Sequence, residues 1–260
     1  MLLKQRAQLP AAKRVVVKVG SSSISNGNEA NIDILVSALA EAHSRGTEII
    51  LVTSGAIATG MPLLDISAKP SDLPTAQALA AVGQSRLIAR YQASLERFGW
   101  VAGQVLLTSE DLAGEETRSN AREAMNRLLE LGVLPIVNEN DTVATAEIRF
   151  GDNDRLAALV AVLVEADALV LLSDIDALYD MPPTNPGAKR ISEVAFEDDL
   201  SWIQVGDTSS SVGTGGAITK VAAAKLANES AISVLLTNLT QVSRALGGEP
   251  VGTWFQGEEA

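Results

Sequence analysis

Apolar residues follow two patterns that alternate along the chain. Short runs rich in valine, isoleucine and leucine are typical of buried strands, and longer segments with apolar residues three or four apart are typical of helices. The predicted strands are Arg14–Gly20, Glu48–Val52, Trp100–Thr108, Leu134–Asn138, Ala168–Asp174 and Ser233–Thr237. The predicted helices are Asn31–Arg45, Pro74–Phe98, Thr117–Leu131, Asp154–Ala166 and Ala217–Glu229. After the fifth strand, a loop-rich stretch with Pro182, Pro183 and Pro186 predicts small hairpins.

The order of these elements predicts the fold class. Apolar strands without polar alternation, each followed by a helix, are typical of a mostly parallel sheet covered on both faces. We therefore expect an α/β fold with an open, mostly parallel sheet sandwiched between helices. No linker-like segment divides the chain, so residues 1–260 are expected to form one domain with two lobes. Ligands of such sheets bind at the carboxyl ends of the strands.

Composition and charge exclude several classes of protein. The 260 residues include 20 Lys+Arg, 32 Asp+Glu, one His and no Cys, for a net charge of −12. The lack of cysteine excludes a disulfide scaffold, a thiolate zinc site and a cysteine nucleophile. The negative charge argues against nucleic acid and anionic membranes as partners. The longest apolar run, Leu156–Val164, is far shorter than the roughly 20 residues that span a bilayer, so we expect a cytoplasmic protein.

Glycine-rich and serine-containing turns are candidate anion sites. In GTGGAITK (Gly213–Lys220), backbone amides can approach a phosphate closely, and the Lys220 ammonium can reach it from the first helical turn. The segment matches neither a Walker A loop nor GxGxxG, and it is also typical of a flexible loop that caps a helix. TSGA (Thr53–Ala56) offers the Ser54 hydroxyl and several amides to a carboxylate or phosphate, but such turns between a strand and a helix are common.

Charged residues near the predicted strand ends carry further chemistry. Lys18 lies between valines, where a lysine is either held for a purpose or placed in an edge strand; taken alone, the edge strand is favoured. The stretch Asn138–Asp154 is the most polar segment near a strand end. Its carboxylates can bind a substrate ammonium, order nearby lysines or hold Mg²⁺. Asp152 or Asn153 is also an ordinary N-cap for the helix that follows.

The inventory of reactive groups favours one type of reaction. His43 lies on the polar side of its helix, where a solvated role is expected, so neither a histidine base nor a thiolate is available. Phosphoryl transfer to a carboxylate requires neither, because a carboxylate with a pKa of about 4.3 is already ionised at neutral pH. Catalysis then depends on positioning, cations and amide donors. The two lysines, the small-residue turns and the acidic stretch supply these.

Six motifs together resemble those of the glutamate 5-kinases, a group within the amino acid kinase family. In chain order they are VKVGSS (Val17–Ser22), VTSGAIATG (Val52–Gly60), AAVGQSRL (Ala80–Leu87), VNENDTVATAEIRFGDND (Val137–Asp154), LLSD (Leu171–Asp174) and VGTGGAITK (Val212–Lys220). The resemblance runs from about Arg14 to Phe255. It implies ATP- and Mg²⁺-dependent phosphorylation of the γ-carboxylate of L-glutamate to L-glutamyl 5-phosphate. This is the first step of proline biosynthesis, and it is commonly inhibited by proline.

The resemblance also implies roles for individual residues. Lys18 and Lys220 would contact phosphates and stabilise the transition state, and Asp154 would orient them. The residues that would bind glutamate are Ser54, Asp141, Asn153 and Asn138. The residues that would line the nucleotide are Lys18, Ser173, Asp174, Thr214, Gly215, Gly216, Ala217, Ile218, Thr219 and Lys220. Glutamate would occupy an N-terminal lobe (14–150) and ATP a C-terminal lobe (151–255), while the metal ligands stay unassigned.

The chain departs from the family pattern in places. Ala217 stands where many members have methionine, and Ser173 replaces a common threonine but keeps the hydroxyl. Many bacterial members carry a C-terminal PUA domain, which we do not expect here, and we do expect a homo-oligomer. Two alternatives are a kinase of the same fold for another small carboxylate or phosphate substrate, and a non-catalytic sensor of proline or glutamate. The acidic stretch favours a substrate with a free α-amino group, and the two lysines favour catalysis.

Overall fold

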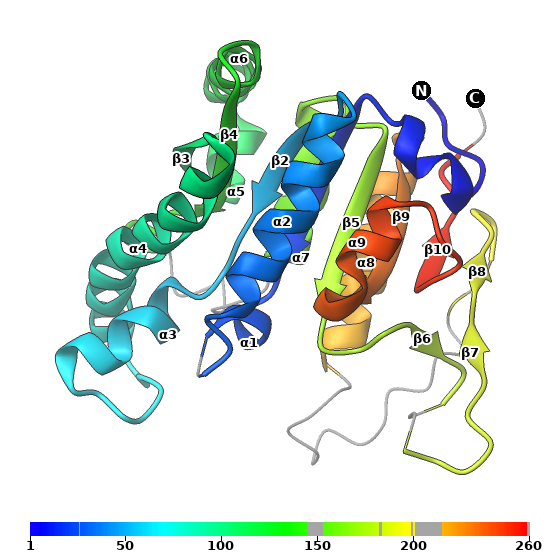
Figure 1. Cartoon of the computed structure of the whole chain (residues 1–260). Coiled ribbons are helices and arrows are strands. Elements are labelled where there is room, and N and C mark those ends of the chain that lie inside the picture. The colour runs from blue at the N-terminus through cyan, green and yellow to red at the C-terminus, as the bar shows by residue number, and fades with distance from the viewer. Residues whose placement is uncertain (26, 145–152, 182–183, 199, 201–214, 259–260) are drawn as a thin grey trace.

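An eight-stranded sheet forms the centre of the fold (Figure 1). The computed structural model describes residues 1–25, 27–144, 153–181, 184–198, 200 and 215–258. In the order in which they pair, the strands are β3 (Val101–Leu107), β4 (Val133–Glu139), β2 (Glu48–Val52), β1 (Arg14–Val19), β5 (Ala168–Ser173), β9 (Ser233–Asn238), β10 (Thr253–Phe255) and β8 (Glu193–Val194). All neighbours run parallel except β9 and β10. The sheet is therefore open and mostly parallel, as predicted.

Helices cover both faces of this sheet (Figure 1). One face packs against α2 (Asn31–Ser44), α4 (Leu73–Leu95) and α9 (Val242–Leu246). The other face packs against α5 (Ser109–Ala113), α6 (Glu115–Glu130), α7 (Asp154–Leu163) and α8 (Gly215–Asn228). Two short helices, α1 (Ser21–Ile24) and α3 (Ala56–Gly60), follow the carboxyl ends of β1 and β2. The 3-10 turns are η1 (Arg6–Ala11), η2 (Met61–Leu64), η3 (Glu96–Phe98) and η5 (Leu239–Gln241).

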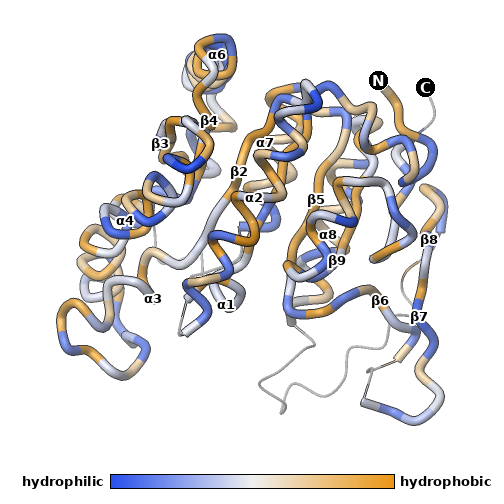
Figure 2. Tube along the Cα trace, in the orientation of Figure 1, coloured by the Kyte–Doolittle hydropathy of each residue, from blue (hydrophilic) through white to orange (hydrophobic). Residues whose placement is uncertain are grey.

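Alternate residues of the central strands belong to two separate hydrophobic cores. In β1, Val15 and Val17 join the core beneath α2, α4 and α9, whereas Val16 joins the core beneath α7 and α8. The central strands are hydrophobic along most of their length (Figure 2) because both of their faces are covered. Side chains of a strand alternate between faces, so Lys18 points with Val16 toward α7 and α8.

Every predicted strand and helix is present, with ends that differ by a few residues. The predicted hairpins are also confirmed in part: β6 (Leu178–Tyr179) pairs antiparallel with β7 (Arg190–Ile191). The sequence pattern did not predict α3, α9 or β10, each of which is five residues or shorter. Elements of that length are too short to show a recognisable period.

The placement of Lys18 in an edge strand is wrong. β1 lies in the middle of the sheet, where Lys18 is flanked by Val52 of β2 and by Leu171 of β5. The Lys18 side chain is almost fully buried. A lysine at this position cannot reach solvent along the strand, so it requires a buried counter-charge.

Two glycines allow α3 and α4 to touch through their backbones. A Cβ atom added to Gly83 would lie 1.8 Å from the carbonyl oxygen of Ala56, and one added to Gly60 would lie 2.1 Å from that of Leu79. Any side chain at either position would push the two helices apart. Because α3 directly follows Ser54 and Gly55, this contact also fixes the turn at the carboxyl end of β2.

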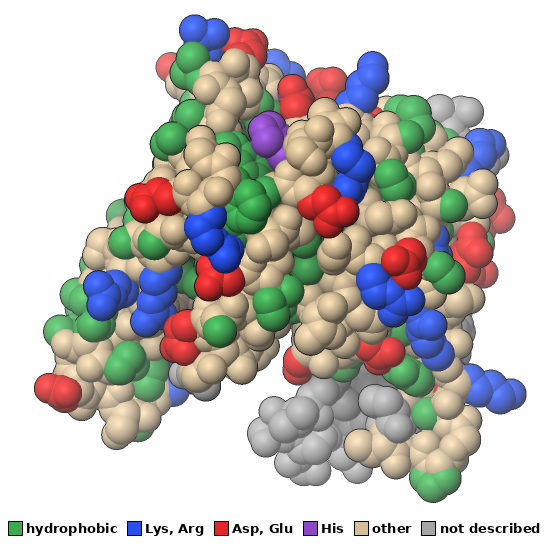
Figure 3. Space-filling view, viewed as in Figure 1, with side chains coloured by type: hydrophobic (Ala, Val, Ile, Leu, Met, Phe, Trp, Pro, Cys, Tyr) green, Lys and Arg blue, Asp and Glu red, His purple; other side chains and the backbone are tan. Residues whose placement is uncertain are grey.

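The surface carries charges of both signs. On the face seen in Figure 3, acidic and basic side chains are interspersed. Among the described residues, no helix is both long and apolar enough to span a membrane.

We predict that Gly83→Ala lowers the free energy of unfolding by about 1–2 kcal/mol. Overpacking a filled site costs about 1–3 kcal/mol, which outweighs the roughly 1 kcal/mol that alanine gains over glycine in a helix. Urea denaturation measures the change. Ser85→Ala, at an exposed position of the same helix, is the control and should be nearly neutral. A Gly83→Ala protein more stable than wild type would contradict the close contact.

Candidate active site

Two buried ammonium groups share one buried carboxylate near the carboxyl end of β1. Lys18 Nζ lies 2.5 Å from Asp154 Oδ1, and Lys220 Nζ lies 2.9 Å from Asp154 Oδ2. The Thr219 hydroxyl donates to the same Oδ2 atom at 3.3 Å. Asp154 is fully buried, and both lysines are at most 9% exposed. Two ammonium groups are thus held at fixed positions near the carboxyl end of β1, an arrangement suited to an anion.

The fold brings these three residues together from distant parts of the sequence. Lys18 points to the α7 side of the sheet because of its position in β1, and Asp154 is the first residue of α7. Lys220 lies in the second turn of α8, which packs beside α7. The structure thus unites the three residues to which the family resemblance gives a catalytic role.

A cavity of about 390 Å³ lies at the carboxyl ends of β2 and β4. Its polar lining consists of Ser21, Ser54, Ser67, Lys69, Asn138, Glu139, Asp141 and Asn153. All four residues expected to bind glutamate are in this set. The cavity is joined to the lysine centre through the chain itself, because Asn153 faces the cavity and the next residue, Asp154, holds both lysines.

Part of the cavity lining offers hydrogen-bond donors. The Ser54 hydroxyl is buried and has no hydrogen-bond partner among the described residues. Gly55 follows with φ of 101°, a left-handed conformation that favours glycine, and it turns the chain into α3. Lys69 adds an ammonium group at the rim, where it is exposed. A hydroxyl and an ammonium group that line one cavity are suited to a carboxylate.

Two carboxylates that line the same cavity, those of Asp141 and Glu139, offer acceptors. Burial raises the pKa of Asp141 to about 6. Burial also raises the pKa of Glu139, and the nearby negative charge of Asp141 raises it further. Each carboxylate is more costly to ionise here than in water, and an incoming cation would offset that cost. These carboxylates are therefore suited to an ammonium group.

Three amides and a backbone carbonyl connect the cavity to the interior. Asn153 Nδ2 donates to Thr53 O at 2.5 Å and to Asn138 Oδ1 at 2.7 Å. Asn138 Nδ2 in turn donates to Gln84 Oε1 at 2.6 Å. Gln84, Asn138 and Asn153 are each less than 10% exposed. The hydrogen bonds hold the polar side chains of the cavity in one arrangement.

Apart from Lys18, the described residues expected to line a nucleotide lie at the end of β5 and at the start of α8. Ser173 ends β5 and donates its hydroxyl to Asp174 at 2.8 Å. Gly215 and Gly216 begin α8, followed by Ala217, which packs partly against the core, and by Ile218, which is 49% exposed. Thr219 and Lys220 contact Asp154 as described above. Thr214 lies outside the described residues.

The described residues do not form a metal cage of their own. They contain no group of three or more His, Asp or Glu side chains placed to hold an ion. Both oxygens of Asp154 already contact lysines. Asp174, exposed directly after β5, is the one carboxylate among the residues predicted to line the nucleotide.

Comparison with known proteins identifies the family. The model of the amino acid kinase family matches residues 13–238. Glutamate 5-kinase from Clavibacter sepedonicus is 64% identical over 250 residues, which cover 96% of each chain. The one from Leifsonia xyli is 61% identical over 256 residues, 98% of this chain and 95% of its own. The chain belongs to the amino acid kinase family, among its glutamate 5-kinases.

A solved structure gives the same fold at low sequence identity. Carbamate kinase from Giardia lamblia bound to AMP-PNP superposes with a TM-score of 0.67 and 18% identity. The match covers 96% of this chain and 100% of the carbamate kinase. At this identity the likeness shows the fold alone.

Some residues of the kinase site escaped the sequence analysis. Lys69 lies in a loop without a helical or strand pattern, so only the structure places it at the cavity. Gln84 lies at a buried position of a helix, where a polar residue among apolar ones was a usable signal. Glu139 was part of the acidic stretch but had no role of its own.

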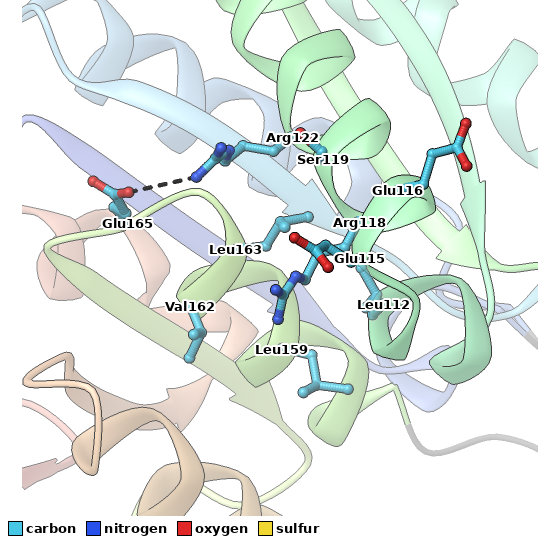
Figure 4. Close-up of a pocket in the computed structure, with 10 residues that line it drawn as sticks. All are labelled: Leu112, Glu115, Glu116, Arg118, Ser119, Arg122, Leu159, Val162, Leu163 and Glu165. Carbon is cyan, nitrogen blue, oxygen red and sulfur yellow. Dashed lines mark ion pairs between the residues drawn. The ribbon is translucent and has the colours of Figure 1, made fainter.

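A second cavity of the kinase, about 670 Å³, holds none of the predicted site residues (Figure 4). It lies between α6 and α7, with leucines from α5 and α7 and charged side chains from α6. Arg122 and Glu165 face each other across it at 3.9 Å, and both are exposed. Exposed pairs of this kind contribute little to stability. Arg122 therefore serves as a control position for the experiments below.

We predict that Asp154→Asn lowers the free energy of unfolding by about 3 kcal/mol. The substitution leaves two buried ammonium groups without a carboxylate, and breaking a buried ion pair on one side costs about 3–5 kcal/mol. Urea denaturation at neutral pH measures the loss. Asp174→Asn removes an exposed carboxylate and is the matched control. Equal stability of the two variants would contradict the role of Asp154 as the counter-charge.

Proposed function

We propose that this kinase transfers the γ-phosphoryl group of ATP to the γ-carboxylate of L-glutamate, giving L-glutamyl 5-phosphate and ADP, the first step of proline biosynthesis. The observation that carries the proposal is the contact between two sites. A cavity lined by a hydroxyl, an ammonium group and two carboxylates adjoins a buried centre in which two lysines contact one aspartate. The names of the relatives at 61–64% identity support the same reaction.

In the proposed complex, the walls of the cavity orient glutamate by its α-substituents. Asp141 and Glu139 attract the α-ammonium group, and Ser54 and Lys69 bind the α-carboxylate. The side chain of glutamate then extends past Asn153 toward the lysine centre. This orientation presents the γ-carboxylate to the phosphoryl group and leaves the α-carboxylate bound elsewhere.

The lysine centre supplies the electrostatic part of catalysis. An oxygen of the γ-carboxylate attacks the γ-phosphorus, and the bond from that phosphorus to the β,γ-bridging oxygen breaks. The nucleophile is already ionised, so no base is needed. Lys18 and Lys220 reduce the repulsion between the two anions and stabilise the charge that develops on the transferred group. Asp154 keeps both ammonium groups at fixed positions.

In the proposed complex, the ATP site lies at the end of β5 and at the start of α8. The amides at the start of α8, together with Ser173 and Lys220, hold the phosphates, because a helix N-terminus attracts anions. Mg²⁺ accompanies ATP and neutralises part of its charge. An N-terminal lobe (14–150) binds glutamate and a C-terminal lobe (151–255) binds ATP. Feedback inhibition by proline, homo-oligomeric assembly and a cytoplasmic location rest on the family resemblance.

We predict that hydroxylamine traps an acyl phosphate when ATP, Mg²⁺ and glutamate are all present, and that ADP release requires glutamate. Lys18→Ala and Lys220→Ala should each lower kcat at least 100-fold, because each removes a cation that acts on the transferred group. The nucleotide affinity, measured by calorimetry, should change much less. Arg122→Ala should keep kcat within a factor of two.

Two results would contradict these assignments. If the wild-type protein releases no ADP with glutamate but does so with another small carboxylate, that carboxylate takes the place of glutamate as the substrate. Near-wild-type turnover of both lysine variants would remove the lysines from the transition state.

We predict that kcat/KM for glutamate falls below pH 6. The raised pKa of Asp141, about 6, means that this carboxylate becomes protonated as the pH falls through that value and stops attracting the α-ammonium group. Well below pH 6, kcat/KM for glutamate should fall by about tenfold per pH unit, which a plot of kcat/KM against pH measures. In Asp141→Asn, kcat/KM should be lower at pH 7.5 and should lose this dependence on pH. An unchanged break near pH 6 in the variant would exclude Asp141 as its source.

A further inference from the structure

Gln84 ends the buried chain of amides that reaches the proposed glutamate site. It lies in α4, on the opposite side of Asn138 from the cavity residue Asn153. Its Oε1 atom accepts the hydrogen bond from Asn138 Nδ2 at 2.6 Å, whereas its Nε2 atom has no partner among the described residues. Gln84 therefore contributes to the chain as an acceptor.

Backbone groups fix the direction of every hydrogen bond in this chain. The Glu139 N–H group donates to Asn138 at 2.9 Å, so the atom that faces it must be the oxygen Oδ1. The Thr53 carbonyl accepts from Asn153 at 2.5 Å, so the atom that faces it must be the nitrogen Nδ2. With Oδ1 of Asn138 occupied in this way, its Nδ2 requires an acceptor, and Gln84 Oε1 is that acceptor.

This direction determines what Asn153 can offer to a ligand. Both hydrogens of its Nδ2 are used, one by Thr53 O and the other by Asn138 Oδ1. The remaining polar atom of the side chain, the carbonyl oxygen Oδ1, is an acceptor. Because Asn153 lines the same cavity as Asp141, it adds an uncharged acceptor to the carboxylates that attract an ammonium group there.

We infer that Gln84 is a positioning residue that makes the cavity selective for substrates with an α-amino group. It acts through Asn138, whose orientation it maintains, and thereby keeps the acceptor oxygen of Asn153 available to the substrate. Without the acceptor on Gln84, the buried Asn138 Nδ2 loses its partner while the Glu139 N–H group still holds Oδ1, so the Asn138 side chain shifts to find another partner. The acceptor of Asn153 at Asn138 moves with it, and the carbonyl oxygen of Asn153 loses the fixed position from which it accepts from an ammonium group.

The packing of α4 against α3 holds Gln84 at a fixed distance from Asn138. The preceding residue, Gly83, touches the backbone of α3, and this contact allows no side chain. α4 is thus held against the segment that carries Ser54, and Gln84 is held against Asn138. The proposal rests on the proposed glutamate kinase activity, since it concerns the selectivity of the same cavity.

The test compares an isosteric variant with a variant that keeps the acceptor. Gln84→Met matches glutamine in length and removes both polar atoms, whereas Gln84→Glu keeps an oxygen opposite Asn138 and changes only the unpartnered Nε2 position. The readout is the ratio of kcat/KM for glutamate to kcat/KM for glutarate, which lacks the α-amino group, with kcat/KM for ATP alongside. We expect Gln84→Met to lower the ratio at least tenfold, and Gln84→Glu to stay within threefold of wild type.

The possible outcomes separate this proposal from the proposed function. Wild-type protein that is inactive with glutamate contradicts the proposed function, whatever the variants do. An active Gln84→Met protein with an unchanged ratio overturns the role of Gln84. If Gln84→Glu lowers the ratio as much as Gln84→Met does, the role of Gln84 is also overturned, because the shape of the side chain rather than its acceptor would then decide the selectivity. If Gln84→Met fails to fold, Gln84→Ala replaces it under the same criteria.

Discussion

The contact of two lysines with one aspartate is the interaction on which the site depends. It joins a central strand, β1, to the first residue of α7 and to the second turn of α8, so three elements from the two ends and the middle of the chain meet at one carboxylate. Removing charged groups from water is costly unless they are paired, and Asp154 supplies a buried carboxylate that contacts both lysines. A protein with a net charge of −12 thus holds two ammonium groups together in its interior. An anion bound beside them would interact with both.

The substrate cavity and this centre share one peptide unit. Asn153 belongs to the cavity and Asp154 to the lysines, so a shift of one displaces the other. The cavity is lined by both donors and carboxylates, and amides deeper in the protein hold some of its side chains in place. The sequence motif with Gly83 and Gln84 has a physical explanation in these terms: the glycine sets the distance between two helices, and the glutamine supplies the buried acceptor of Asn138.

Much of this could be predicted from the sequence, and the failures have identifiable causes. The spacing of apolar residues was sufficient to predict the α/β fold, because buried parallel strands are uniformly apolar. Lys18, Ser54 and Lys220 were singled out by a lysine between valines, a turn of small residues and a glycine-rich segment, and the family resemblance gave them and Asp154 their predicted roles. The edge position of Lys18 was wrong because a strand's own residues do not reveal its neighbours in the sheet. Lys69 was missed because its position at the cavity depends on a loop path that has no periodic signal.

The adjacency of Gly83 and Gln84 constrains how α4 can change over evolutionary time. One inserted or deleted residue rotates everything beyond it by about 100° around the helix axis. An insertion or deletion in α4 close to Gly83 and Gln84 would place another side chain against the backbone of α3 or turn the Gln84 side chain away from Asn138. Substitutions on the exposed face of α4 are free of both constraints. The length of this helix is therefore expected to be far more strictly preserved among active relatives than its surface composition.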